Sequence, residues 1–102
     1  MANPTVVWSP KAKRDLQSIV FYILSQGSPG IAERIGLEIY EQALTLTNNP
    51  ERVGRLSPEF KSPLIREIEY KKWRIIYHLG DSGTVMISRI RHKAQLLTAD
   101  DL

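Results

Sequence analysis

The run Trp73-Arg74-Ile75-Ile76-Tyr77-His78-Leu79, with the turn Gly80-Asp81-Ser82-Gly83 and the run Thr84 to Arg91 behind it, decides the fold of this chain. In the first run large apolar side chains recur at every second position, which is the period of a strand. The Gly-Asp-Ser-Gly segment has the composition of a hairpin turn. Just upstream, Pro63 to Tyr70 forms a similar run, separated only by Lys71-Lys72. We therefore expect three consecutive antiparallel strands.

Ahead of these strands the sequence predicts a short strand and a helix. Thr5 to Trp8 is β-branched and aromatic, and Ser9-Pro10 ends it with an N-cap residue and a proline suited to the first helical position. The apolar residues that follow recur at helical spacing as far as about Ser25. Most of this apolar set should pack inside the hairpin or the core: Trp8, Ala12, Leu16, Ile19, Val20, Tyr22 and Ile23.

A second helix is predicted from Ser28-Pro29 to about Thr47, since Gly27 ends the first. Its apolar stripe consists of Ala32, Ile35, Ile39, Ala43 and Leu46. Leu37, Tyr40 and Leu44 widen the apolar arc past half the circumference. Either these three residues form a binding ridge for a partner, or the sheet and the first helix each cover part of the arc, which is the simpler explanation.

Length and composition place the chain among ordinary globular proteins. With 102 residues, 42% hydrophobic and 25% charged, it should form one domain spanning residues 1–102. We expect an α+β fold, a helical hairpin packed on one face of a small antiparallel sheet, with the other face open to solvent or a ligand. The start of the chain lacks the pattern of a secretory leader, so we expect a cytoplasmic protein without membrane association.

The chemistry available to the chain is limited. It has no cysteine, and no phosphate-binding loop, nucleophile elbow or metal-binding histidine pair is visible, so neither a metal nor another cofactor is expected. The net charge of +3 comes from the second half, where basic residues gather on the strands with aromatic residues among them. Such a pattern suits a nucleic-acid or acidic partner, but it is equally typical of protected strand edges, and Glu67 and Glu69 could neutralise part of it.

One pattern is specific. Trp8-Ser9-Pro10-x-Ala12-x-x-Asp15-Leu16-x-x-Ile19-x-x-Tyr22-Ile23 resembles the opening of the RelE/ParE superfamily of bacterial toxins from type II toxin–antitoxin systems. Further landmarks occur in the family's order: Pro50 before Gly54-Arg55, then Arg66-Glu67, then Trp73 to Tyr77, then Ile87 to His92. The resemblance spans residues 5 to about 97.

The resemblance implies the fold expected above and a toxin held inactive by a cognate antitoxin. Leu37, Tyr40 and Leu44 then become the candidate antitoxin-binding residues. Operator DNA would be bound only through the antitoxin complex. Asp15 is expected to pair with a strand arginine and to order the fold.

The superfamily contains two mechanisms. RelE-like members cut mRNA in the ribosome without a metal, and Arg74 and His92 match their phosphate-contacting arginine and terminal-strand histidine. ParE-like members inhibit DNA gyrase. The tail after His92 has no tyrosine where many ribonuclease members have one, and the opening looks more like the ParE side.

We therefore expect a ParE-like gyrase inhibitor. The alternatives are a RelE-like, ribosome-dependent mRNA endonuclease and an inactive member that only binds antitoxin. In any active form the expected contacts to nucleic acid or target come from basic residues of the strands and tail, namely Arg66, Arg89, Arg91 and Lys93.

Overall fold

The computed structural model describes residues 4–102, so the predictions that involve residues 1–3 lie outside the described residues. All six predicted elements are present: β1 (Thr5–Trp8), α1 (Pro10–Ser25), α2 (Pro29–Leu44), β3 (Ile65–Tyr70), β4 (Trp73–Leu79) and β5 (Thr84–His92). Two elements were not predicted, the one-turn helix α3 (Pro50–Val53) and the short strand β2 (Arg55–Leu56). Three single 3-10 turns, at Thr45–Thr47, Asp81–Gly83 and Ala99–Asp101, complete the secondary structure of the described residues.

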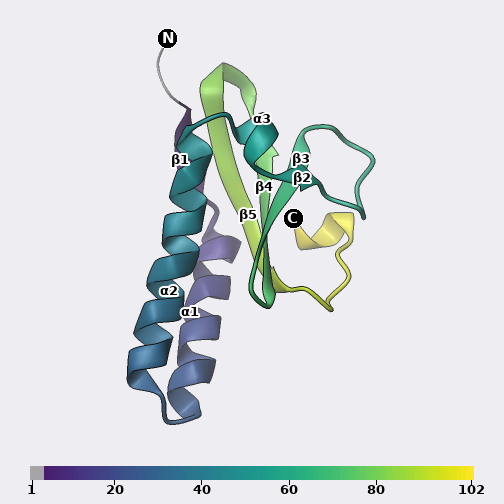
Figure 1. The fold of residues 1–102 in the computed structure, drawn as a ribbon. Coiled ribbons are helices and arrows are strands. Elements are labelled where there is room, and N and C mark those ends of the chain that lie inside the picture. Colours follow the sequence, from purple (N-terminus) through teal and green to yellow (C-terminus); the bar gives the residue numbers. More distant parts are fainter. Residues whose placement is uncertain (1–3) are drawn as a thin grey trace.

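The strands form one sheet in the order β1-β5-β4-β3-β2. Strands β3, β4 and β5 pair antiparallel through short turns, as the sequence predicts, whereas β1 lies parallel to β5 at the edge (Figure 1). The helical hairpin carries the chain from β1 at one edge of the sheet to β2 at the opposite edge. A long connection of this kind allows β1 and β5 to pair in parallel. The α+β class is thus confirmed, with a sheet that is mostly antiparallel.

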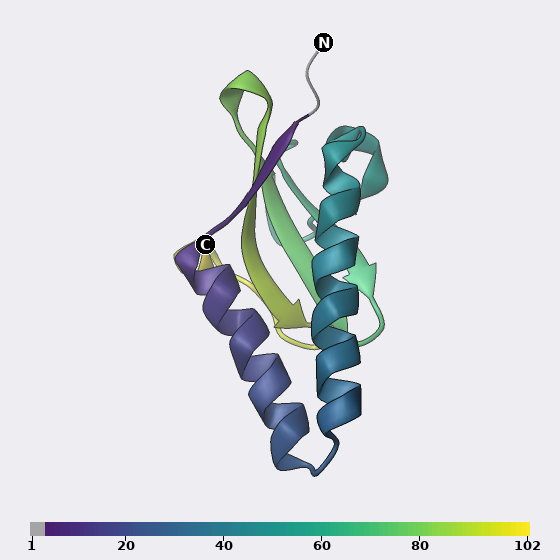
Figure 2. The same cartoon turned by 90° about the vertical axis from the view of Figure 1, so that its left-hand side faces the viewer.

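Helices α1 and α2 lie side by side against one face of the sheet (Figure 2). The Ser9 side chain accepts a hydrogen bond from the Ala12 N–H at 3.0 Å and so caps α1 as expected, while Gly27 ends the helix with a φ of +81°. The core beneath the helices includes Ile39 and Ile75, both fully buried. Burial stabilises each such side chain by about 1.5–3 kcal/mol relative to exposure.

The prediction that the other face of the sheet is open is wrong. The loop after β2 and the tail after β5 lie over it, on the side away from the helices (Figure 1). Ile76 of β4 is fully buried there, and Leu97 of the tail is only 4% exposed. The cover is favourable because it removes the apolar surface of Ile76 and Leu97 from water.

A second correction concerns Tyr22, which is 66% exposed although its spacing predicts a place inside the hairpin. Of the other predicted residues of α1, Ala12 lies in the core, Leu16, Ile19 and Ile23 pack against it, and Val20 is partly buried. Figures 1 and 2 show the reason: the linked ends of α1 and α2 run past the end of the sheet, so no strand lies beneath the last turns.

Candidate functional site

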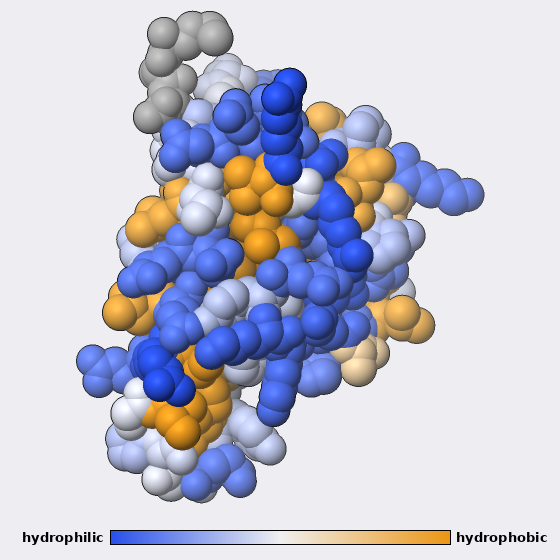
Figure 3. Space-filling model, in the orientation of Figure 1, coloured by the Kyte–Doolittle hydropathy of each residue, from blue (hydrophilic) through white to orange (hydrophobic). Residues whose placement is uncertain are grey.

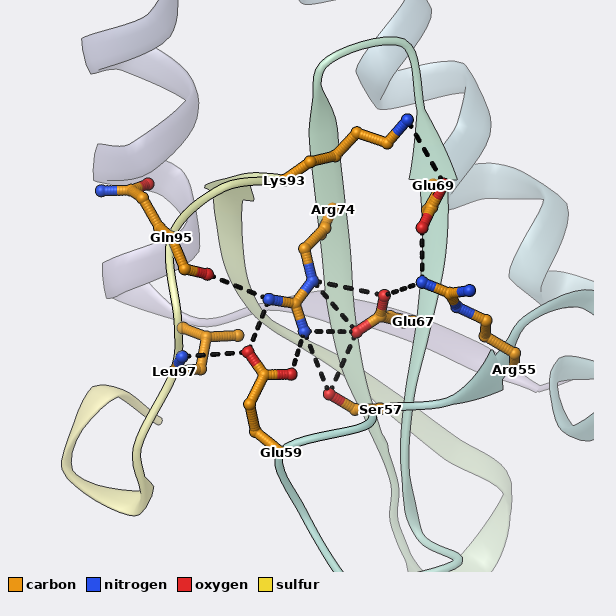
Figure 4. A network of polar contacts seen from close by, with 9 residues as sticks. All are labelled: Arg55, Ser57, Glu59, Glu67, Glu69, Arg74, Lys93, Gln95 and Leu97. Carbon is orange, nitrogen blue, oxygen red and sulfur yellow. Dashed lines mark hydrogen bonds and ion pairs between the residues drawn. The ribbon is translucent and has the colours of Figure 1, made fainter.

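Arg74 is held by two carboxylates on the face of the sheet away from the helices (Figure 4). Its guanidinium donates hydrogen bonds to both Glu67 carboxylate oxygens at 2.6–3.3 Å and to Glu59 Oε2 at 2.7 Å. A further hydrogen bond runs to the Gln95 carbonyl at 3.0 Å. Arg74 is 4% exposed. All three nitrogens of this arginine therefore have protein acceptors.

The two carboxylates extend this network across the fold. Glu67 is fully buried and also accepts from Ser57 Oγ at 3.1 Å and Arg55 Nη2 at 3.2 Å. Glu59 accepts a hydrogen bond from the Leu97 N–H at 3.0 Å. The cluster thus fastens both covering segments to the sheet, the loop through Glu59 and the tail through Leu97.

The charges in this network stabilise one another. Hydrogen bonding to Arg74 holds the pKa of Glu59 below its ordinary value of 4.5, against the opposing effect of burial. In return, the hydrogen bond to Glu59, followed by that to Glu67, raises the pKa of the Arg74 guanidinium. Removing one partner would leave charge in a nearly dry site, which is costly.

A second ion pair joins the helices to the sheet. Asp15 of α1 accepts from Arg89 Nε at 2.7 Å and Nη2 at 3.0 Å, which confirms the expected pairing with a strand arginine. The same carboxylate accepts the Ile90 N–H at 2.9 Å. This backbone group needs a partner because β1 pairs with β5 only between Thr84 and Ile87. Hydrogen bonding to Asp15 raises the pKa of Arg89.

The other predicted target-binding residues make separate contacts, although Arg89 and Arg91 both lie near Asp101. Arg66 donates to the Gly54 carbonyl at 2.8 Å, beside the helix-facing side chain of Tyr77. Lys93 pairs at the surface with Glu69 at 3.4 Å. Within residues 4–102 the buried Nε atoms of Arg66 and Arg91 have no hydrogen-bond partner. These residues and Arg89 do not converge on one cavity.

Arg74 and His92, the predicted nuclease pair, do not share a site. In the β4–β5 register Trp73 lies opposite His92 and Arg74 lies opposite Arg91. Because neighbours along a strand point to opposite faces, His92 lies with Trp73 on the helix side and Arg74 on the tail side. His92 Nδ1 accepts the Ala94 N–H at 3.1 Å.

The predicted antitoxin-binding residues lie exposed along α2. Leu37 is 55% exposed, Tyr40 46% and Leu44 44%, so the simpler explanation, that the sheet and α1 cover them, is wrong. The Tyr40 ring stacks on Trp8, with the ring centroids 6.2 Å apart. The row is thus available to a partner.

Sequence reasoning missed Glu59 and Ser57. Both lie in a loop without periodicity, and no local signal connects them with an arginine on β4. Within the described part of the chain, no group of three or more His, Cys, Asp or Glu side chains could hold a metal ion. No helix among residues 4–102 is long and apolar enough to span a bilayer.

This architecture defines the class. It is the fold of RelE/ParE toxins, since the chain superimposes on a protein of the chromosomal ParDE toxin–antitoxin system from P. aeruginosa with a TM-score of 0.73, at 21% identity, covering 87% of this chain and 95% of that one. A chain of the RelBE2 toxin–antitoxin complex from Mycobacterium tuberculosis gives a TM-score of 0.67 at 26% identity, covering 93% and 97%. No curated protein matches the sequence.

Within that class the family is also shown. The model of the ParE toxin of the type II toxin–antitoxin system, parDE, matches residues 6–97. The chain therefore belongs to the ParE toxin family of RelE/ParE type II toxin–antitoxin systems.

Proposed function

We propose that this ParE toxin acts by binding and inhibiting DNA gyrase in the bacterial cytoplasm, and that a cognate antitoxin neutralises it. The observation that carries the proposal is the ParE family match over residues 6–97. A gyrase inhibitor works by binding a protein and needs no catalytic residues of its own. The absence of a joint site for Arg74 and His92 agrees with this mode of action.

The arrangement of Arg74 supports protein binding over mRNA cleavage. A general acid or base has to reach the proton that it transfers, and an arginine that stabilises a phosphate has to reach the same reacting group. Arg74 has two carboxylates as partners and lies on the opposite face from His92. A phosphate at Arg74 would have to displace Glu59 and Glu67. The geometry therefore favours the gyrase-directed mechanism.

The proposed antitoxin partner is supported by the relatives and by the surface. Both related structures described above come from toxin–antitoxin systems. The exposed row of Leu37, Tyr40 and Leu44 offers apolar area that a partner could cover. In this proposal the toxin contacts operator DNA only through the antitoxin.

The test is a supercoiling assay with the purified toxin, bacterial gyrase, ATP and relaxed plasmid, run beside a cell-free translation reaction. We expect the toxin to reduce supercoiling, the antitoxin to restore it, and translation to continue. His92→Gln should inhibit gyrase like the parent. Full supercoiling at excess toxin together with arrested translation and cut mRNA would establish the endonuclease instead. No effect in either assay, with intact antitoxin binding, would identify an inactive member.

A further inference from the structure

Charged side chains form a continuous surface across the end of the sheet that lies beside the helical hairpin. Lys71 and Lys72 make the two-residue turn between β3 and β4, and the Lys93 N–H donates to the Lys72 carbonyl at 2.8 Å. Lys71 Nζ lies 3.4 Å from the carboxylate of Glu38 on α2. Lys93 Nζ lies 3.4 Å from the carboxylate of Glu69 on β3 (Figure 4). Figure 3 shows mostly hydrophilic surface over this part of the molecule.

This surface holds more positive than negative charge. Each of its two carboxylates is shared between two cations, because Glu38 also pairs with Arg34 at 3.7 Å and Glu69 also pairs with Arg55. Lys72 is exposed, and no ion pair between residues 4–102 involves it. We call the five cations of this surface the basic strip: Arg34, Arg55, Lys71, Lys72 and Lys93. With two carboxylates beside five cations, the excess of positive charge here is as large as the net charge of +3 of the whole chain.

The turn at the centre of the basic strip holds lysine against the preference of its backbone. Lys71 has a φ of +53°, in the left-handed region that favours glycine and asparagine. Two-residue turns between antiparallel strands usually contain Asn or Gly for this reason. The Lys71 ammonium group instead lies 5.5 Å from the centre of the Tyr70 ring, at the surface. A residue that its own backbone conformation disfavours points to a role for its side chain.

The chemistry of the basic strip suits a line of phosphates. The side chains of Lys71 and Lys93 are about half exposed, at 48% and 46%, despite their ion pairs. A lysine carries a compact charge on a flexible stem, so it can follow phosphates without a fixed geometry. Duplex DNA presents about one negative charge per 1.7 Å of its axis, a density that the scattered carboxylates of a protein surface do not reach. Charge density therefore favours a DNA duplex over an acidic protein as the partner of the strip.

We infer that the basic strip contacts the phosphate backbone of the DNA duplex that gyrase holds while the toxin is bound. This inference rests on the proposed gyrase target and adds a second component to that target. The contact does not depend on base sequence, so it differs from recognition of operator DNA, which belongs to the antitoxin in the proposal above. Of the four residues predicted to contact nucleic acid or target, Lys93 is the one that the strip contains.

The first experiment measures the binding of the purified toxin to a short fluorescent DNA duplex by anisotropy at several salt concentrations. The double variant Lys71→Asn/Lys72→Gln removes two charges, and its asparagine suits the left-handed backbone, so the fold should be at least as stable as in the parent. We expect this variant to bind about tenfold more weakly. The slope of log K against log salt should fall by about 1.8 in magnitude, which is about 0.9 for each lost phosphate contact.

A matched control removes the same charge elsewhere. Lys13→Gln/Lys61→Gln changes two exposed lysines outside the strip, and we expect it to bind the duplex within about twofold of the parent with an unchanged salt slope. Equal losses in the two double variants would show that only net charge acts and would overturn the inference, as would unchanged binding in the strip variant. Competition by poly-L-glutamate as strong as that by DNA would assign the strip to an acidic protein surface instead. Thermal unfolding checks that each variant is folded.

The second experiment places the contact in the gyrase complex and separates it from the proposed function. Calorimetry measures toxin binding to gyrase alone and to gyrase with a bound duplex. We expect DNA to strengthen binding of the parent by about tenfold or more, because the second contact becomes intramolecular. The strip variant should lose this gain and bind free gyrase like the parent. A toxin that binds the duplex through the strip but does not bind gyrase would refute the gyrase target alone. A parent toxin that binds gyrase equally well with and without DNA would refute the strip contact alone.

Discussion

The Asp15 carboxylate on α1 and the Arg89 guanidinium on β5 form a two-point ion pair across 74 positions of sequence. Both side chains are largely buried, at 15% and 13% exposure. Asp15 also receives the Ile90 N–H, at the part of the β5 edge that β1 does not reach. One side chain thus fixes the helical hairpin to the sheet by charge and by a backbone hydrogen bond.

Substitution of Asp15 should separate these two contributions. Asp15→Asn keeps an acceptor for Ile90 but loses the charge, and we expect a loss of about 2 kcal/mol in the free energy of unfolding. Asp15→Ala loses both contributions and should cost about 3–4 kcal/mol, as for a broken buried pair. Urea unfolding measures both values. Equal stability of Asp15→Asn and the parent would show that the ion pair contributes nothing.

Removal of Arg74 should destabilise the fold. Arg74→Met leaves Glu59 and Glu67 without their main cation, and we expect a loss of about 3–5 kcal/mol in the free energy of unfolding. Replacing both glutamates with Gln in the same chain should recover most of this loss, because the buried charges are then gone. Chemical unfolding of the single and triple variants checks the expectation.

Toxicity of the triple variant then distinguishes structure from catalysis. If Arg74 acts only through the fold, the stable triple variant still inhibits gyrase. A stable variant without any toxicity would instead assign Arg74 a direct role at the target.

Gly54 should tolerate no side chain. A Cβ at this position would lie 2.5 Å from the Glu67 carbonyl oxygen and would also meet the Tyr77 hydroxyl, which accepts a hydrogen bond from the Gly54 N–H. We expect Gly54→Ala to cost about 2 kcal/mol or more. Gly30→Ala is the matched control, because its Cβ meets nothing within 4 Å, and it should stabilise α2 by about 0.5–1 kcal/mol. An equal decrease of the melting temperature in both variants would refute the steric argument.

Acid should loosen the network around Arg74. The pKa of Glu59 is lowered in the folded protein, so its contribution to stability is present above its ordinary value of 4.5 and is lost as the pH falls below it. Glu59→Gln removes this linkage, and its free energy of unfolding should therefore decline less steeply than that of the parent below pH 4.5. Urea titrations at a series of acidic pH values compare the two slopes. Parallel slopes would mean that Glu59 is not the group responsible.

Local patterns predicted most of the fold. Apolar spacing located both helices and four strands, and Ser9-Pro10 and Gly27 gave the bounds of α1, because caps and periodicity are properties of neighbouring residues. The two elements that were not predicted, α3 and β2, have four and two residues, which are too few to show a period. The position of the tail after His92 was not predicted either, since it depends on tertiary contacts such as the hydrogen bond from the Leu97 N–H to Glu59.

The candidate site was less predictable for the same reason. The pairing of Asp15 with a strand arginine was predicted from the sequence, although the particular partner, Arg89, required the structure. Arg74 lies on a predicted strand, but its acceptors Glu59, Glu67 and the Gln95 carbonyl come from three segments that only the tertiary fold brings together. The exposure of Tyr22 likewise depends on where the two helices extend past the ends of the strands.

The parallel pairing of β1 with β5 also determines when the sheet can form during synthesis of the chain. Thr5 pairs with Thr84, so the ribosome must add the residues between them before the first strand has a neighbour. At ~20 residues per second that delay is about 4 s or more. The contacts are also distant in sequence, which slows folding after release. An unfinished nascent chain that lacks β5 therefore cannot close the sheet, and β1 stays without its neighbouring strand until β5 has been made.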